Sequence, residues 1–233
     1  MTATAVPTAT AKEPAAIRTT VGKKMLVAAS GILFIGFVLA HMVGNLKIFL
    51  GPGPINKYGE FLRDMGEPIF PRSVLLWALR SVLFVGLIVH VVLTVHLARK
   101  SRAARDVRYV HPGVVEANWA SRTMRWGGLV ILLFLIFHLM DFTWGVHPHF
   151  VRGDVYGNAV SGFTRVPVTI VYLFAMVALA LHLYHGTWST FQTLGVNRAR
   201  WDKGIRALAL GLAVIIPLGY SLVPLAVVFR IVK

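Results

Sequence analysis

A chain of 233 residues with 56% hydrophobic residues, 14% charged residues and a mean hydropathy of +0.68 cannot cover a water-facing surface, since soluble domains carry about 25% charged residues. A soluble globular enzyme and a disordered protein are therefore excluded. The formal net charge is +15, but the basic residues lie between long apolar segments, where they set membrane topology rather than bind nucleic acid. The sequence has no cysteine, which excludes disulfides, thiolate-held iron–sulfur clusters, cysteine zinc sites and covalently attached haem.

The N-terminal stretch is rich in Ala, Thr and Pro and has no apolar periodicity. We expect residues 1–22 to form a disordered cytoplasmic tail and residues 23–233 to form one membrane domain. Five apolar segments follow, each close to the about 20 residues that a membrane-spanning helix needs. The expected fold is an all-α integral membrane protein with five transmembrane helices. The expected spans are 25–49, 74–98, 124–144, 166–194 and 205–229.

The basic residues are divided unevenly between the two sides that five spans define. The tail, the segment after the second span and the segment after the fourth carry 15 Lys and Arg, counting those at the span ends, against eight on the other side. Cytoplasmic loops are enriched in Lys and Arg. We therefore expect the N-terminus in the cytoplasm and the C-terminus outside.

The nine histidines are the main clue to function. His111, His147 and His149 fall in connecting segments and are expected to be solvated. An ionisable side chain is costly in hydrocarbon, so a histidine inside a span indicates a functional site, although a single one can also serve as an interhelical hydrogen bond. The histidines within or at the ends of spans are His41, His90, His96, His138, His182 and His185.

Depth divides four of these histidines into two pairs. With a rise of 1.5 Å per residue, His41 and His138 lie roughly 24 and 21 Å from the cytoplasmic starts of their spans, toward the outer leaflet. His90 and His182 each lie roughly 24 Å from an outer start, toward the cytoplasmic leaflet. Two pairs at two depths suit two haems in a bundle of the first four helices. His96 follows His90 by six residues, is turned roughly 120° away, and is not expected to be a ligand.

Two imidazoles on one iron leave no open position for oxygen, so the expected chemistry is electron transfer. Gly44, Gly86 and Gly186 share helix faces with the paired histidines. They either leave room for a flat macrocycle or allow close helix packing.

Four stretches resemble the helices of a known family. In order and spacing they are similar to the dihaem cytochrome b membrane anchor of succinate dehydrogenase and fumarate reductase, the succinate:quinone oxidoreductases or respiratory complex II. The stretches are AHMVGNL around His41, VHVVLTVHLARKSRAAR around His90, SRTMRWGGLVILLFLIFHLMDFT around His138 and YLFAMVALALHLYHGTWSTFQTLG around His182. The resemblance covers nearly the whole chain from Thr19 onward. It makes the same four histidines axial ligands of two haem b groups, with His41 and His138 distal and His90 and His182 proximal.

The resemblance also implies a function and partners. The chain would pass electrons from an iron–sulfur subunit through both haems to quinone, with menaquinone expected, and would perform no succinate chemistry itself. A flavoprotein and the iron–sulfur protein would dock at the cytoplasmic face of a bacterial cytoplasmic membrane. Membrane lipid would surround the chain, nucleic acid is not expected, and a higher oligomer of the complex is compatible with the family. Some menaquinol-oxidising members have a glutamate where Ala180 stands, which favours succinate oxidation here.

Candidates for the quinone site are less sharply indicated. Quinone reduction consumes two protons, so a titratable group must reach the quinone oxygens. Carboxylates between the first two spans lie toward the outer haem, although each is also a plausible solvated loop residue: Glu60, Asp64 and Glu67. A pocket on the cytoplasmic side would use residues that can also serve helix packing or interface anchoring: Ser30, His185 and Trp188. Four basic residues could pair with haem propionates, but a role in topology or contact with a lipid headgroup explains each of them as well: Lys24, Lys47, Arg125 and Lys203.

Three other interpretations stay open. Another bis-histidine cytochrome b, serving a hydrogenase, a formate dehydrogenase or an ascorbate-linked reductase, would share the ligands but not the LHLYHGTWSTFQTLG helix. A transporter or channel with a histidine proton relay, or an anchor with vestigial ligands, would hold no haem and would be colourless.

Overall fold

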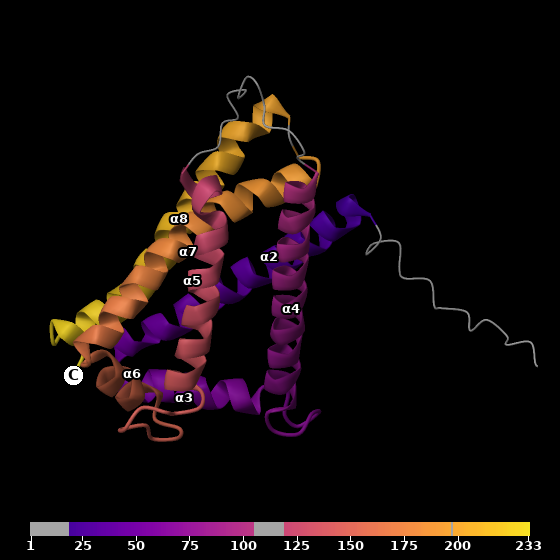
Figure 1. Ribbon diagram of the computed structural model, residues 1–233. Helices are drawn as coiled ribbons and strands as arrows, with labels where there is room; N and C mark the ends of the chain where they lie inside the picture. Colours follow the sequence, from indigo (N-terminus) through magenta and orange to yellow (C-terminus); the bar gives the residue numbers. More distant parts are fainter. Residues whose placement is uncertain (1–18, 105–118, 197) are drawn as a thin grey trace, which may run out of the picture.

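The computed structural model describes residues 19–104, 119–196 and 198–233, the side chains of 119–122 excepted. Every regular element in these ranges is a helix (Figure 1). The elements are α2 (Thr20–Asn45), η1 (Leu46–Leu50), α3 (Pro52–Asp64), α4 (Val74–Ala103), α5 (Trp119–Phe142), α6 (Val155–Phe163), α7 (Val166–Thr193) and α8 (Ala199–Val228). Five stretches are long and apolar enough to cross a membrane, at 20–50, 74–103, 123–142, 166–193 and 199–228. The expected all-α class and the five apolar helices are confirmed.

The helices extend beyond the apolar segments where polar residues favour helix. α2 begins at Thr20, because the Thr19 hydroxyl caps it by accepting a hydrogen bond from the Gly22 amide at 2.9 Å. Residues 20–22 of the expected tail are therefore helical, while residues 1–18 lie outside the described residues. α4 continues to Ala103 through basic residues that suit a helix C-terminus. α8 starts six residues early, with Asp202 in its first turn.

Two short helices, α3 and α6, were not expected, and both lie at one end of the bundle (Figure 1). Asn56 on α3 joins them. Its amide nitrogen donates to Asp154 at 3.1 Å, and its oxygen accepts from the Tyr156 amide at 3.0 Å. Asp154 also caps α6 by accepting from the Gly157 amide at 2.9 Å. We call this end of the molecule the α3/α6 end; in the expected topology it faces outward.

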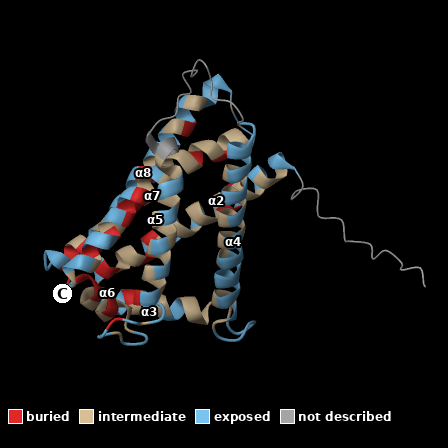
Figure 2. Cartoon of the chain, in the orientation of Figure 1, coloured by how far each residue is buried: buried red, intermediate tan, exposed pale blue. Residues whose placement is uncertain are grey.

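The long helices form two groups. α2 packs along α4, while α7 packs against both α5 and α8, and α2 joins the groups by contacting α7 and α8. In Figure 1, α4 stands at one edge of the bundle and α8 at the other. Figure 2 places most buried residues on α7, α8 and the α3/α6 end, whereas α4 has none. An apolar helix without a fully buried residue, such as α4, fits a lipid environment.

Candidate functional site

The structure brings the four span histidines that depth had paired into two neighbouring couples. His41 on α2 and His138 on α5 have ring centroids 6.1 Å apart. His90 on α4 and His182 on α7 have ring centroids 6.3 Å apart. We call these the outer pair and the inner pair. Each pair takes one imidazole from the α2–α4 group and one from the α5–α7–α8 group.

The spacing within each pair fits two imidazoles on opposite sides of one metal. A metal–imidazole bond is about 2.0–2.1 Å for zinc, and with about 1.1 Å from nitrogen to ring centre the two centroids lie about 6.2–6.4 Å apart. In the part of the chain that the structure describes, no three His, Cys, Asp or Glu side chains gather around a metal position. Two imidazoles alone could hold a metal only if other ligands, such as those of a macrocycle, completed its coordination.

Hydroxyl groups orient one imidazole of each pair. Ser30 is buried, and its hydroxyl donates to the carbonyl of Leu26 or Val27 at 2.9 or 3.0 Å, so its oxygen accepts from Nδ1–H of His90 at 3.0 Å. Nδ1 of His138 lies 3.1 Å from the hydroxyl of buried Tyr172. A hydrogen bond that Nδ1–H donates, as at His90, leaves the Nε2 lone pair for a metal. Nδ1 of His182 is buried without a partner.

The glycines near the histidines serve mainly helix packing. A Cβ on Gly44 would lie 2.5 Å from the Tyr58 ring of α3, and a Cβ on Gly86 would lie 3.1 Å from Leu33 of α2. Two glycines not considered in the sequence lie beside the inner pair. A Cβ on Gly31 would be 3.9 Å from His90, and a Cβ on Gly128 would be 3.7 Å from His182. Backbone without side chains therefore lies next to both inner rings.

The carboxylates expected near the outer pair lie at the molecular surface. Glu60 and Glu67 are exposed, and Asp64 pairs with Arg72 at 2.8 Å in a half-exposed ion pair. No hydrogen bond or ion pair among the described side chains joins these three residues to the outer histidines. They lie on α3 and the turn that follows it, at the α3/α6 end.

A buried ion pair that the sequence analysis missed lies at the same end. Asp141 is 4% exposed and follows His138 by one turn of α5. Arg165 donates to Oδ1 of Asp141 at 2.6 Å, while Oδ2 is buried without a partner. The sequence does contain a sign of this pair: Asp141 is an acidic residue at the end of an apolar span, one turn from His138.

His147 is not solvated, so that expectation was wrong. The side chain is 6% exposed, packs beside Phe142 and Phe150 with ring centroids 6.3 and 5.6 Å away, and leaves Nε2 buried without a partner. The segment folds inward because the Asn158 amide holds Val151, accepting from its N–H at 2.8 Å and donating to its carbonyl at 2.7 Å. Burial lowers the pKa of His147 although the nearby Asp141 carboxylate acts to raise it. His149 is exposed, and His111 lies outside the described residues.

The candidates for the opposite end separate into two places. Ser30 is bonded to His90, as described above. His185 and Trp188 lie together with ring centroids 6.3 Å apart, and the Trp188 indole N–H donates to Asp202 at 3.5 Å. Asp202 in turn accepts from Arg206 at 2.7 Å. His96 is exposed, with Nε2 2.8 Å from the Lys23 ammonium.

Comparison with known proteins adds no relative: no family model matches the chain, and no curated protein or solved structure matches it. The resemblance therefore depends on the four sequence stretches, and the site depends on its own geometry.

Proposed function

We propose that the chain is a dihaem cytochrome b of a membrane, with the outer pair ligating one haem and the inner pair the other. The observation that carries the proposal is the centroid spacing of 6.1 and 6.3 Å in two separate imidazole pairs. The hydroxyls on Nδ1 of His90 and His138 support it, because ligating histidines commonly have their second nitrogen fixed in this way.

Within that class, we propose the membrane-anchor subunit of a bacterial succinate:quinone oxidoreductase. The four helix sequences around the histidines support this assignment, and so does the lack of cysteine, since the iron–sulfur clusters must then belong to a partner. The haems supply one-electron transfer between that partner and quinone. The chain's residues hold the imidazoles, and the apolar helices keep water from the electron path.

For quinone, with menaquinone expected, we propose the α3/α6 end. Asp141 Oδ2 and His147 Nε2 are buried polar atoms without partners there. A protonated Nε2 of His147 can donate to a quinone oxygen, and the Asp141 carboxylate can accept from a quinol hydroxyl. Glu60, Asp64 and Glu67 lie at the surface of the same end, where they can exchange protons with water.

Haem stoichiometry tests the first step. The purified full chain should contain two haem b by pyridine haemochrome quantification and give a reduced-minus-oxidised spectrum. His138→Leu and His182→Leu should each retain one haem, because each removes a ligand of a different pair. His96→Ala is the matched control and should retain both. A colourless protein, or a His96→Ala variant that loses a haem, contradicts the ligand assignment.

Electron entry tests the second step. In membranes that contain the assembled complex, succinate should reduce both haems, whereas a cytochrome serving a hydrogenase or formate dehydrogenase would be reduced by hydrogen or formate instead. In His182→Leu, succinate should reduce the remaining outer haem slowly, while dithionite should still reduce it fully. Reduction of that haem by succinate at the normal rate would show that electrons do not pass through the inner pair.

A further inference from the structure

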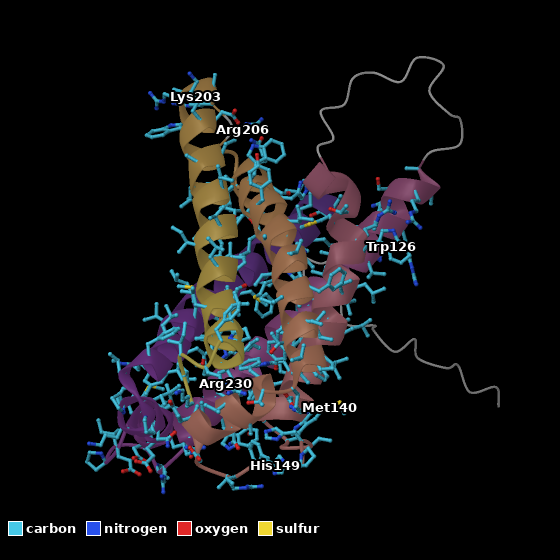
Figure 3. All side chains as sticks on the ribbon, turned by 90° about the vertical axis from the view of Figure 1, so that its left-hand side faces the viewer. Trp126, Met140, His149, Lys203, Arg206 and Arg230 are labelled. Carbon is cyan, nitrogen blue, oxygen red and sulfur yellow. The ribbon has the colours of Figure 1, made fainter. Side chains whose placement is uncertain are left out.

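A pocket opens between the last turn of α4 and the first turns of α5, at the end of the bundle opposite α3 and α6. Its volume is about 220 Å³, and its lining consists of Arg102, Arg125, Trp126 and Leu129. A pocket of this volume has room for a group larger than a single water, which needs only about 10–15 Å³ on the same measure. The indole of Trp126 is 74% exposed, so the pocket faces away from the bundle interior. Figure 3 shows Trp126 on the outside of the helices.

The charges of this pocket are unbalanced. Both guanidinium groups are exposed, and neither has an ion pair or a hydrogen bond among the described residues. Among the described residues, no carboxylate lines the pocket. Three other arginines have ion-pair partners: Arg165 with Asp141, Arg206 with Asp202 and Arg72 with Asp64. Two unpaired guanidiniums close to each other repel, so an anion bound between them would relieve that repulsion.

The pocket is polar on one side and apolar on the other. Guanidinium groups recognise phosphate through parallel hydrogen bonds. Trp is enriched where the headgroup region meets the hydrocarbon, and Leu129 lies on α5 one turn further along the helix, 45% exposed. A ligand that satisfies both sides carries an anionic phosphate joined to apolar chains that run along the lipid-facing helices.

We propose that this pocket binds the headgroup of an anionic phospholipid, with the phosphate between Arg102 and Arg125 and the first part of an acyl chain against Trp126 and Leu129. Basic pockets between membrane helices on the side with the basic excess are a recognised form of lipid recognition. None of the four lining residues is one of the paired histidines.

The test uses the purified full chain in detergent and native mass spectrometry. Dioleoyl phosphatidylglycerol is the anionic probe, dioleoyl phosphatidylcholine is the neutral probe with the same chains, and inorganic phosphate is a competitor without chains. The wild-type chain should bind the anionic lipid more tightly than the neutral one. Arg102→Gln with Arg125→Gln should weaken binding of phosphatidylglycerol about 30-fold, from two surface charges, and leave phosphatidylcholine unchanged.

Matched variants separate the pocket from basic charge in general. Arg198→Gln with Arg200→Gln removes two exposed arginines beside another exposed indole, Trp201, and should change binding less than about threefold. Trp126→Leu keeps both charges and should weaken both lipids alike. All replaced side chains are exposed, so folding should be unaffected.

Four results would overturn the proposal. They are equal affinity for the two lipids, equal loss in the Arg198/Arg200 variant, displacement of the lipid by equimolar inorganic phosphate, and loss of a haem from the Arg102/Arg125 variant. The third would make the pocket a site for free phosphate, and the fourth would assign the arginines to haem propionates.

Discussion

Two side-chain hydroxyls determine how two of the four imidazoles are presented. Tyr172 is buried, and its ring packs edge-on against Phe134 and Phe163, so the hydroxyl has little freedom to leave Nδ1 of His138. Ser30 occupies the corresponding place for His90. If these contacts position metal ligands, then removing one should weaken a single haem while leaving the other intact.

Tyr172→Phe is the direct form of this experiment. We expect the outer haem to bind about 10–100-fold more weakly, the usual cost of removing a group behind a ligating histidine, and the inner haem to be unaffected. Haem titration of the apoprotein, followed by the two spectral components, gives the measurement. Tyr156→Phe is the control, because it removes a hydroxyl that donates to the Lys233 carbonyl at 2.9 Å on the surface. Equal haem affinity in the two variants would count against an orienting role.

The Asp141–Arg165 pair should make a large contribution to stability that depends on which partner is removed. Arg165→Gln leaves a buried carboxylate unpaired and should lower stability by about 3 kcal/mol. Asp141→Asn should cost less, because Arg165 is 35% exposed and can reach water. Thermal unfolding in detergent, followed by circular dichroism, should rank the two variants in this order.

The exposed Asp64–Arg72 pair provides the comparison, since its N···O distance of 2.8 Å is similar. Arg72→Gln should cost less than about 1 kcal/mol, because water screens the pair. Similar melting temperatures for Arg165→Gln and Arg72→Gln would show that burial of Asp141 does not matter.

Contacts between elements depend on positions without a side chain. Gly44 on α2 faces the Tyr58 ring of α3, and an added Cβ would come within 2.5 Å of it. Gly44→Ala should therefore push α3 away from α2 and cost about 1–3 kcal/mol. Gly36→Ala on the same helix meets nothing within 4 Å and should be neutral or stabilising by up to about 1 kcal/mol. Melting temperatures in detergent compare the two, and a Gly44→Ala variant as stable as Gly36→Ala would refute close packing at this contact.

The five apolar helices could be predicted because a membrane helix needs only length and apolarity, both of which are local in sequence. Which histidines pair could be predicted from their depth in the spans, because the rise per residue of a helix is fixed.

The sequence did not predict α3, because its opening Gly-Pro-Gly-Pro is typical of a loop. Asp141 on α5 and Arg165, just before α7, are 24 residues apart in the sequence. No sequence pattern sets the relative orientation of the two elements. The burial of His147 depends on the Asn158 clamp, which is equally non-local.

At the scale of the whole molecule, the uneven distribution of charge predicts an orientation. Fifteen Lys and Arg on one side against eight on the other predict an N-terminus in the cytoplasm. Alkaline phosphatase fused after Lys233 should be active, and the same reporter fused after Ala104 should be inactive. The opposite result would invert the protein in the membrane and exchange the depths of the two histidine pairs.

Because the helices form two groups, the proposed haems would also hold these groups together. Each imidazole pair connects α2 or α4 to α5 or α7, whereas α4 itself has no buried residue and packs mainly along α2. Two iron atoms would thus clamp the halves together at two heights, and ligation energy would be shared with assembly. Cells starved of haem should then accumulate less of this chain, because unclamped halves expose α4 to membrane proteases. Pulse-chase labelling with and without a haem precursor would measure that lifetime, so the supply of a pigment would set the quantity of a protein.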